Sequence, residues 1–242
     1  MSLSRSLEVC AFNVESCMLA EQAGARRVEL CDNPVEGGTT PSYGMIQRTR
    51  EKITILLYPI IRPRSGNYIY SEEEFEVLRK DILICKELGC DGISVGVQTI
   101  TGEIDLDRFK RIVEWAYPMG VTSNRVFDTA PDPVKALEQL IQAGCERVLT
   151  SGQRSAAPLA IPLLTALVKQ ANGRISIMPG AGVKSVNLPN LLATGAMEYH
   201  ASASKVVPNI VAHQNPEVLD YGTPVLADLE ELKKMVDILR GK

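Results

Sequence analysis

A short phrase occurs four times in this chain and constrains its fold more than any other feature. Each copy begins with a glycine, followed by Ala or Cys, two further residues and an alternating apolar stretch. The copies are GARRVEL from Gly24, GCDGISV from Gly89, GCERVLT from Gly144 and GAMEYHA from Gly195. Each glycine follows an amphipathic run, and glycine ends helices because it adopts the left-handed cap conformation without steric penalty. Each copy therefore predicts a helix end followed by a short strand.

Four more strand-like stretches lie between these copies, at residues 7–12, 55–63, 121–128 and 175–180. The chain thus has eight predicted strands, and a helical pattern follows at least the first seven. Eight βα units in 242 residues predict an α/β fold, a single (β/α)8 TIM barrel, which takes about 250 residues. One domain then covers residues 1–242, with an irregular loop over about 203–224 and a closing helix over about 225–239.

The composition restricts the partners that we expect. Apolar residues make up 45% of the sequence, enough for a buried core, and the formal net charge is -3. Lys and Arg are scattered, without the basic stripe of a nucleic-acid-binding protein. The longest apolar run, around residues 53–61, is too short to span a bilayer, and no apolar signal segment follows the N-terminal MSLSRS. We therefore expect a cytoplasmic protein with no nucleic acid and no membrane partner.

The cysteines do not form a disulfide framework. None belongs to a C-x-x-C pair, and a chain of this length without a signal peptide keeps its thiols reduced and mostly buried. The six are Cys10, Cys17, Cys31, Cys85, Cys90 and Cys145.

Side-chain alternation on the first two strands predicts which residues face the barrel interior. Leu7 and Val9 suit the outer face against the helices, so Glu8 and Cys10 point inward. The second strand repeats the pattern and turns Glu29 and Cys31 inward. Two neighbouring strands thus each carry Glu-x-Cys on the inner face, where most TIM barrels have branched apolar residues.

Further polar residues come at the ends of other predicted strands. A buried carboxylate needs a partner, and Arg62 and Arg64 at the end of the third strand are the natural candidates. Asp128 and Arg125 close the fifth strand. Glu198, His200 and Ser202 share one face of the eighth strand, which closes against the first. We therefore expect a ligand site at the mouth of the barrel, the C-terminal ends of its strands, built from Glu8, Glu29, Arg62, Asp128, His200 and two thiols.

One interpretation of this mouth is a site for a soft metal ion. Thiolates favour Cu(I) and Zn(II), and Cu(I) accepts few ligands. Adjacent strands lie about 4.8 Å apart, so Cys10 and Cys31 can share one ion, with Met178 and His200 as additional candidate ligands. Two cysteines on strands are also common as inert packing, which leaves the metal site as one alternative.

The other interpretation is an enzyme that acts on a small anionic metabolite, such as a phosphorylated one. Gly180 and Gly182 after the seventh strand, Ser185 and Ser202 offer backbone N–H groups where TIM barrels commonly bind phosphate. Acid–base catalysis would then come from Glu8, Glu29, Asp128 or His200, with Arg62 holding the anion. No lysine lies in any predicted strand, which disfavours a Schiff-base aldolase.

The chain closely resembles the CutC family, known as copper homeostasis proteins. The phrases that match the family run in order from the first strand to the eighth, over about residues 7–204. They are LEVCAFNVES, GARRVELCDNPVEGGTTPS, IRPRSGNYIYSEEEFEVL, NRVFDTAPDP, RVLTSG, IMPGAGV and EYHASA.

The resemblance implies a cytoplasmic TIM barrel that forms a homo-oligomer, with a dimer as the expected form. It also implies that the cysteines of E-V-C and E-L-C bind Cu(I). Those are Cys10 and Cys31, the pair that alternation already turns inward. Two positions depart from the family pattern: Asn124 replaces a histidine before the fifth strand's A-F-D, and Ala181 replaces a glycine in P-G-G-G. We favour a copper-binding, non-enzymatic function over the enzyme, for which the residues specify no reaction.

Overall fold

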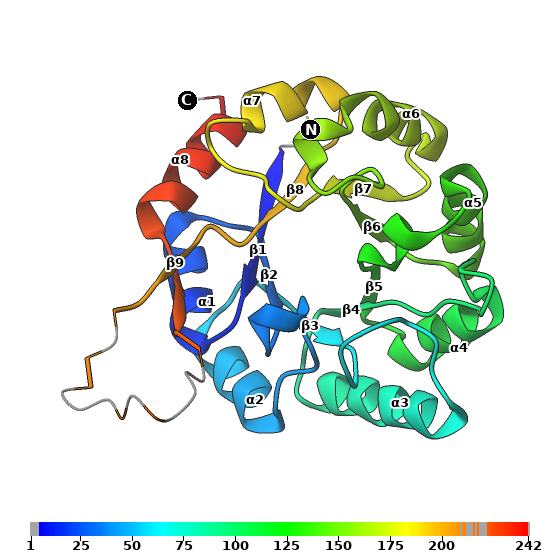
Figure 1. Cartoon of the computed structure of the whole chain (residues 1–242), viewed down its shortest axis with the longest axis horizontal. Coiled ribbons are helices and arrows are strands. Elements are labelled where there is room, and N and C mark those ends of the chain that lie inside the picture. The colour runs from blue at the N-terminus through cyan, green and yellow to red at the C-terminus, as the bar shows by residue number, and fades with distance from the viewer. Residues whose placement is uncertain (1–4, 209, 212–214, 216, 218–221, 242) are drawn as a thin grey trace.

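Eight parallel strands form the ring at the centre of the molecule, and the helices surround it (Figure 1). The computed structural model describes residues 5–208, 210, 211, 215, 217 and 222–241. The strands are β1 Ser6–Ala11, β2 Arg27–Leu30, β3 Leu56–Ile61, β4 Gly92–Val95, β5 Gly120–Ser123, β6 Arg147–Thr150, β7 Ser176–Pro179 and β8 Glu198–Ala201. They pair in the order β7-β6-β5-β4-β3-β2-β1-β8, and contacts between β7 and β8 bring the two edges together. The predicted (β/α)8 TIM barrel is confirmed.

A helix follows each strand, and caps fix most of its boundaries. The helices are α1 Val14–Ala23, α2 Tyr43–Lys52, α3 Glu72–Glu87, α4 Leu106–Ala116, α5 Pro133–Ala143, α6 Ile161–Ala171, α7 Leu188–Leu191 and α8 Leu229–Leu239. Short 3-10 turns add η1 Pro34–Glu36, η2 Arg125–Thr129, η3 Ala157–Leu159 and η4 Leu192–Thr194. Ser71 and Glu74 form the capping box that begins α3. Gly24 and Gly144 end α1 and α5 in the left-handed conformation, as their repeated phrase predicts.

The register between neighbouring strands decides which side chains share the barrel interior. Glu8 lies opposite Arg27 of β2 on one side and His200 of β8 on the other. Cys10 lies opposite Glu29. Because paired residues point to the same face, these five side chains are directed into the barrel, while residues such as Leu7 and Val9 pack under the helices. The predicted alternation of the first two strands is therefore correct.

The fifth strand is shorter than its apolar pattern predicts. It ends at Ser123, and Asn124 accepts a hydrogen bond from the Val126 N–H at 2.9 Å, which starts η2. Asp128 therefore lies in a 3-10 turn beyond the strand, and the prediction that it ends the fifth strand is wrong. The sequence of Arg125–Thr129 is compatible with either a strand or a buried turn, and the Asn124 cap favours the turn.

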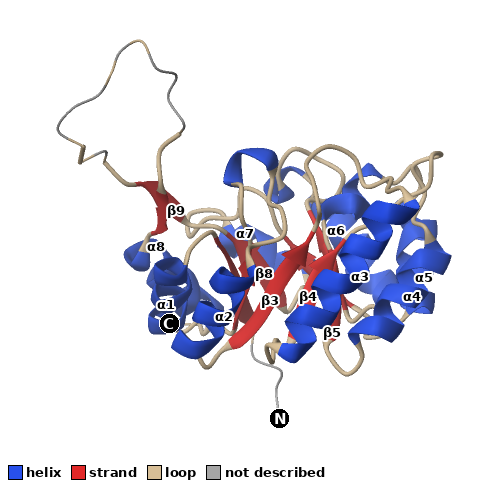
Figure 2. Cartoon of the chain, turned by 90° about the horizontal axis from the view of Figure 1, so that it is seen from below, coloured by secondary structure: helices blue, strands red, loops and turns tan. Residues whose placement is uncertain are grey.

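The described part of the segment after β8 contains two strands that the sequence does not predict. β9 Ser204–Val206 pairs antiparallel with β10 Val225–Ala227, so the predicted loop over 203–224 begins with a strand, and the closing helix begins at Leu229 rather than 225. Figure 2 shows β9 above α1 and α8. Asn13 Nδ2 donates to the Val225 carbonyl at 2.8 Å, which ties β10 to the start of α1. The rest of that predicted loop, residues 209, 212–214, 216 and 218–221, lies outside the described residues.

Within the described part of the chain, no helix combines the length and the apolar character needed to cross a membrane.

Candidate metal centre

Three strands bring a cysteine, a carboxylate and a histidine together inside the barrel. Cys10 comes from β1, Glu29 from β2 and His200 from β8, and their ligand atoms all lie within 4.8 Å of one another. Glu29 and His200 are buried, whereas Cys10 is partly exposed. The sequence predicts all three as site residues, and the register of β8, β1 and β2 makes them neighbours.

The second thiol of the predicted pair joins the same cluster. Cys31 follows β2, and its Sγ lies 3.7 Å from Cys10 Sγ and 3.6 Å from Glu29 Oε2. The Cys31 side chain is buried, and all six cysteines of the chain are free thiols. The two Glu-x-Cys phrases therefore meet at one point, as the resemblance to the family implies.

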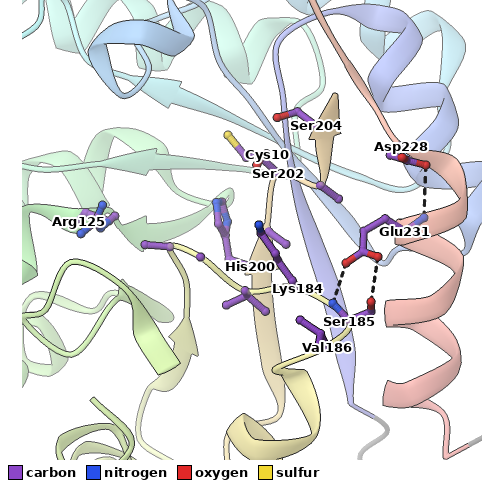
Figure 3. A pocket seen from close by; sticks show the side chains of 15 residues that line it. Cys10, Arg125, Lys184, Ser185, Val186, His200, Ser202, Ser204, Asp228 and Glu231 are labelled. Carbon is purple, nitrogen blue, oxygen red and sulfur yellow. Dashed lines mark hydrogen bonds between the residues drawn. The ribbon is translucent and has the colours of Figure 1, made fainter. Parts of the chain in front are cut away.

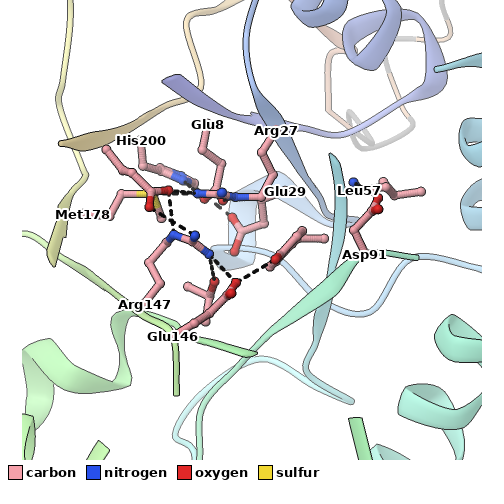
Figure 4. A network of polar contacts seen from close by, with 12 residues as sticks. Glu8, Arg27, Glu29, Leu57, Asp91, Glu146, Arg147, Met178 and His200 are labelled. Carbon is pink, nitrogen blue, oxygen red and sulfur yellow. Dashed lines mark hydrogen bonds and ion pairs between the residues drawn. The ribbon is translucent and has the colours of Figure 1, made fainter. Parts of the chain in front are cut away.

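His200 is oriented by a carboxylate behind it. Its Nδ1 lies 2.7 Å from Glu8 Oε1, and its Nε2 lies 3.8 Å from Glu29 Oε2 (Figure 4). A carboxylate that binds one ring nitrogen of a histidine fixes the tautomer and directs the other nitrogen toward a ligand. Nε2 is thus the nitrogen that faces Cys10 and Glu29.

The charges of the cluster follow from burial and close partners. Burial opposes the ionised form of Glu8, but the attraction of Arg27 and the hydrogen bond to His200 outweigh it and lower the pKa of Glu8 to about 2. A hydrogen bond from Cys31 lowers the pKa of Cys10. Burial raises the pKa of Glu29. The cluster therefore combines an ionised carboxylate behind the histidine with a second carboxylate that resists ionisation in the absence of a cation.

Two arginines at the first positions of β2 and β6 pair with carboxylates inside the barrel. Arg27 pairs with Glu8 and lies 2.5 Å from Glu198 Oε2, while Arg147 lies 2.7 Å from the same oxygen (Figure 4). Both guanidinium groups stack on the ring of Tyr58, at 5.0 and 5.6 Å from its centroid. Neither arginine is among the predicted site residues, although alternation from Glu29 places Arg27 on the inner face of β2.

The predicted pairing of Glu8 and Glu29 with Arg62 and Arg64 is wrong. β3 ends at Ile61, so Arg62 lies beyond it, and its guanidinium donates to the carbonyls of Glu36, Gly38 and Gly66 at 2.7, 2.7 and 2.8 Å. Arg64 pairs with Glu74. Arg62 thus supplies hydrogen-bond donors to three loop carbonyls and holds these loops together.

Asp128 also lies outside the cluster. Its carboxylate accepts hydrogen bonds from Thr150 Oγ1 at 2.6 Å and from the backbone N–H groups of Ser151 and Gln153, and it pairs with Arg125. These contacts hold the loop that follows β6. The structure therefore brings together Glu8, Cys10, Glu29, Cys31 and His200 and leaves Arg62 and Asp128 at the surrounding loops.

A cavity of about 620 Å³ opens from the thiol and the histidine toward the loops after β7 and β8 (Figure 3). Gly182 and Ser202 line it, as the predicted anion cradle requires. Gly180 does not contribute a free N–H, because it donates to the Thr150 carbonyl at 2.9 Å. A Cβ at Gly180 would lie 2.4 Å from Leu149 Cδ1, so close packing explains the glycine.

The donors expected at Ser185 are already occupied. Its N–H and hydroxyl donate to the Glu231 carboxylate at 2.7 and 2.9 Å (Figure 3). The helix that follows Ser185 is the four-residue α7, which begins at Leu188. The Glu231 carboxylate thus occupies the position expected for a bound anion, so only part of the predicted anion cradle is available to a ligand.

Ala181, the departure from the family's glycine, lies in the left-handed region at φ 68. We expect Ala181→Gly to raise the free energy of unfolding by about 0.5–1 kcal/mol, since glycine removes the Cβ strain but loses more chain entropy on folding. Thermal unfolding measures the change. Ala193→Gly in η4 is the matched control, where the same substitution is expected to destabilise; equal effects of both variants would contradict strain at Ala181.

Comparison with known sequences shows extensive similarity to one family. A sequence model of the CutC family matches residues 5–205. A family protein CutC of Parabacteroides distasonis is 48% identical over 234 residues, which cover 96% of this chain and 96% of the relative. The corresponding protein of Chromobacterium violaceum is 45% identical over 213 residues, or 88% of this chain and 86% of the relative.

A solved structure agrees with the sequences. The crystal structure of the "Putative Copper Homeostasis Protein CutC" from Streptococcus agalactiae is 34% identical, with a TM-score of 0.78, and the match covers 82% of this chain and 98% of that chain. The resemblance predicted from the seven phrases is thereby confirmed, and the chain belongs to the CutC family.

Proposed function

We propose that the protein binds Cu(I) through Cys10 and Cys31 and serves copper homeostasis. The observation that carries this proposal is the 3.7 Å separation of the two Sγ atoms. Thiolates are the ligands that select Cu(I), which accepts few of them, so two sulfurs at this distance suffice for one ion. The name of the related Streptococcus agalactiae structure supports the same function.

The surroundings of Cys10 and Cys31 suit an ion that binds reversibly. Cys10 is partly exposed and lines the cavity, whereas Cys31 is buried behind it. The lowered pKa of Cys10 favours the thiolate, which is the form that binds metal. Copper is thus a cargo that enters by the cavity and meets Cys10 first.

The setting of this function follows from the same residues and from the family. Six free cysteines fit a reducing compartment, so we place the protein in the cytoplasm. From the resemblance to the family, we infer that the protein forms a homodimer. Light scattering of the purified protein measures its mass in solution, and a monomer mass would contradict the dimer.

Each of Cys10→Ser and Cys31→Ser is expected to lower Cu(I) affinity by more than about 100-fold, because each removes one of two soft ligands. The measurement is anaerobic competition of the reduced protein against a calibrated Cu(I) chelator. Cys145→Ser is the matched control, since Cys145 is also buried and free but lies outside the cluster. We expect it to keep wild-type affinity. Retention of full affinity by either Cys10→Ser or Cys31→Ser would contradict the proposal.

A further inference from the structure

Glu29 is a buried carboxylate that the arginines of the barrel do not neutralise. Its side chain is only 5% exposed, and the nearest basic group is His200 Nε2 at 3.8 Å. Within the described ranges, no arginine or lysine lies within ion-pairing distance of Glu29, although Glu8 and Glu198 both pair with Arg27. Buried carboxylates are normally paired, protonated or bound to a metal. A Cu(I) site made of two thiols alone does not explain why the Glu29 carboxylate is buried beside them.

Three separations within the cluster match those between the ligands of one tetrahedral ion. With zinc bond lengths of about 2.3 Å to sulfur and about 2.0–2.2 Å to nitrogen and oxygen, tetrahedral ligands lie about 3.4–3.8 Å from one another. The observed separations are 3.7 Å between the two Sγ atoms, 3.6 Å from Cys31 Sγ to Glu29 Oε2 and 3.8 Å from Glu29 Oε2 to His200 Nε2. The ligand atoms of Cys10, Glu29 and His200 also lie within 4.8 Å of one another, so three of the donors surround one point, and Cys31 adjoins two of them.

The groups around the cluster already hold the histidine as a metal ligand requires. Glu8 binds Nδ1 of His200 at 2.7 Å, and Arg27 in turn holds Glu8. Metal-binding histidines usually have such a carboxylate on the second ring nitrogen. Glu8 is therefore a positioning residue, and His200 Nε2 is directed at Glu29 and Cys10 before any ion arrives.

We propose that Cys10, Cys31, Glu29 and His200 together form a tetrahedral site for a divalent ion of the zinc class. The inference rests on the proposed metal-binding function of this pocket and extends it from a thiol pair to four donors. Mixed sulfur, nitrogen and oxygen ligands suit Zn(II), whereas Cu(I) requires only the soft pair. Cys10 and His200 line the cavity and receive the ion, and the buried Glu29 and Cys31 complete its coordination from within.

Co(II) is the spectroscopic probe for this site, because its visible bands report tetrahedral geometry and its near-ultraviolet bands report thiolate ligands. The wild type is expected to bind one Co(II), which Zn(II) displaces, and Cys31→Ser to lose about half of the charge-transfer absorption. Glu29→Gln and His200→Gln are each expected to lower Zn(II) affinity by more than about 10-fold and Cu(I) affinity by less than about 3-fold. Glu231→Gln, a carboxylate change in the same cavity, is the matched control.

The outcomes separate this site from the thiol pair. Wild-type Zn(II) affinity in Glu29→Gln, which preserves side-chain shape, would overturn the four-donor site, and so would a Co(II) spectrum without tetrahedral bands. The Cu(I) proposal would still stand if the cysteine variants lost Cu(I). A different result would support the four-donor site and reject the copper function. In that case Zn(II) binding would depend on Glu29 and His200, while Cu(I) binding would be unchanged in both cysteine variants.

Discussion

The Arg27→Met variant is expected to unfold with a free energy about 3–5 kcal/mol below that of the wild type, because a buried ion pair that loses one partner leaves a charge without compensation. Arg27 is 2% exposed and pairs with both Glu8 and Glu198 inside the barrel. Methionine fills much of the volume but provides no donor. Glu198 then keeps its ion pair with Arg147, and Glu8 keeps its contact with His200.

Urea unfolding followed by circular dichroism measures this loss. Arg79→Met is the matched control, since Arg79 pairs with Glu76 on the exposed face of α3 and its removal is expected to change the stability far less than Arg27→Met. A similar stability of the two variants would mean that the interior ion pairs contribute no more than a surface pair. It would also weaken the argument that Arg27 holds Glu8 in place behind His200.

Acid is expected to remove about 3 kcal/mol of stability through Glu8 alone. Its pKa falls from 4.5 to about 2 in the folded protein, so the folded state binds its proton less readily than the unfolded chain. The sign follows directly: the contribution is complete above pH 4.5 and is lost as the pH falls toward 2. Stability should therefore decline with acid across this window.

The comparison of wild type with Glu8→Gln isolates this contribution. Both proteins contain the same other carboxylates, so the difference between their unfolding free energies at each pH belongs to Glu8 and its partners. We expect the variant to be less stable at neutral pH and the gap to narrow below pH 4.5. A gap that stays constant from pH 6 to pH 3 would contradict an ionised, arginine-paired Glu8.

Much of the fold and the five residues of the cluster are predictable from local patterns. The four glycine phrases mark helix ends, and together with four further strand-like stretches they give the eight units of the barrel. Alternation along β1 and β2 turns Glu8, Cys10, Glu29 and Cys31 inward, and the structure places them there. These features are predictable because a cap or a strand periodicity depends only on residues close in sequence.

The partners of these residues were not predictable in the same way. Which arginine neutralises Glu8 depends on the register of β1 against β2, which no local pattern encodes. Arg62 looks equally suitable from its position after a strand, but it binds loop carbonyls instead. Asp128 was misplaced because one cap at Asn124 converts the expected strand end into a 3-10 turn.

The order of the strands has a consequence for how the protein is made. Glu8 and His200 are in contact but lie 192 residues apart in the sequence. The cluster takes its side chains from β1, β2 and β8, so a ribosome must synthesise nearly the whole barrel before the site exists. A nascent chain has the two thiols without the histidine and its carboxylate. An ion held by the complete cluster thus links the first and last strands, and its binding favours the closed barrel over any partly folded form.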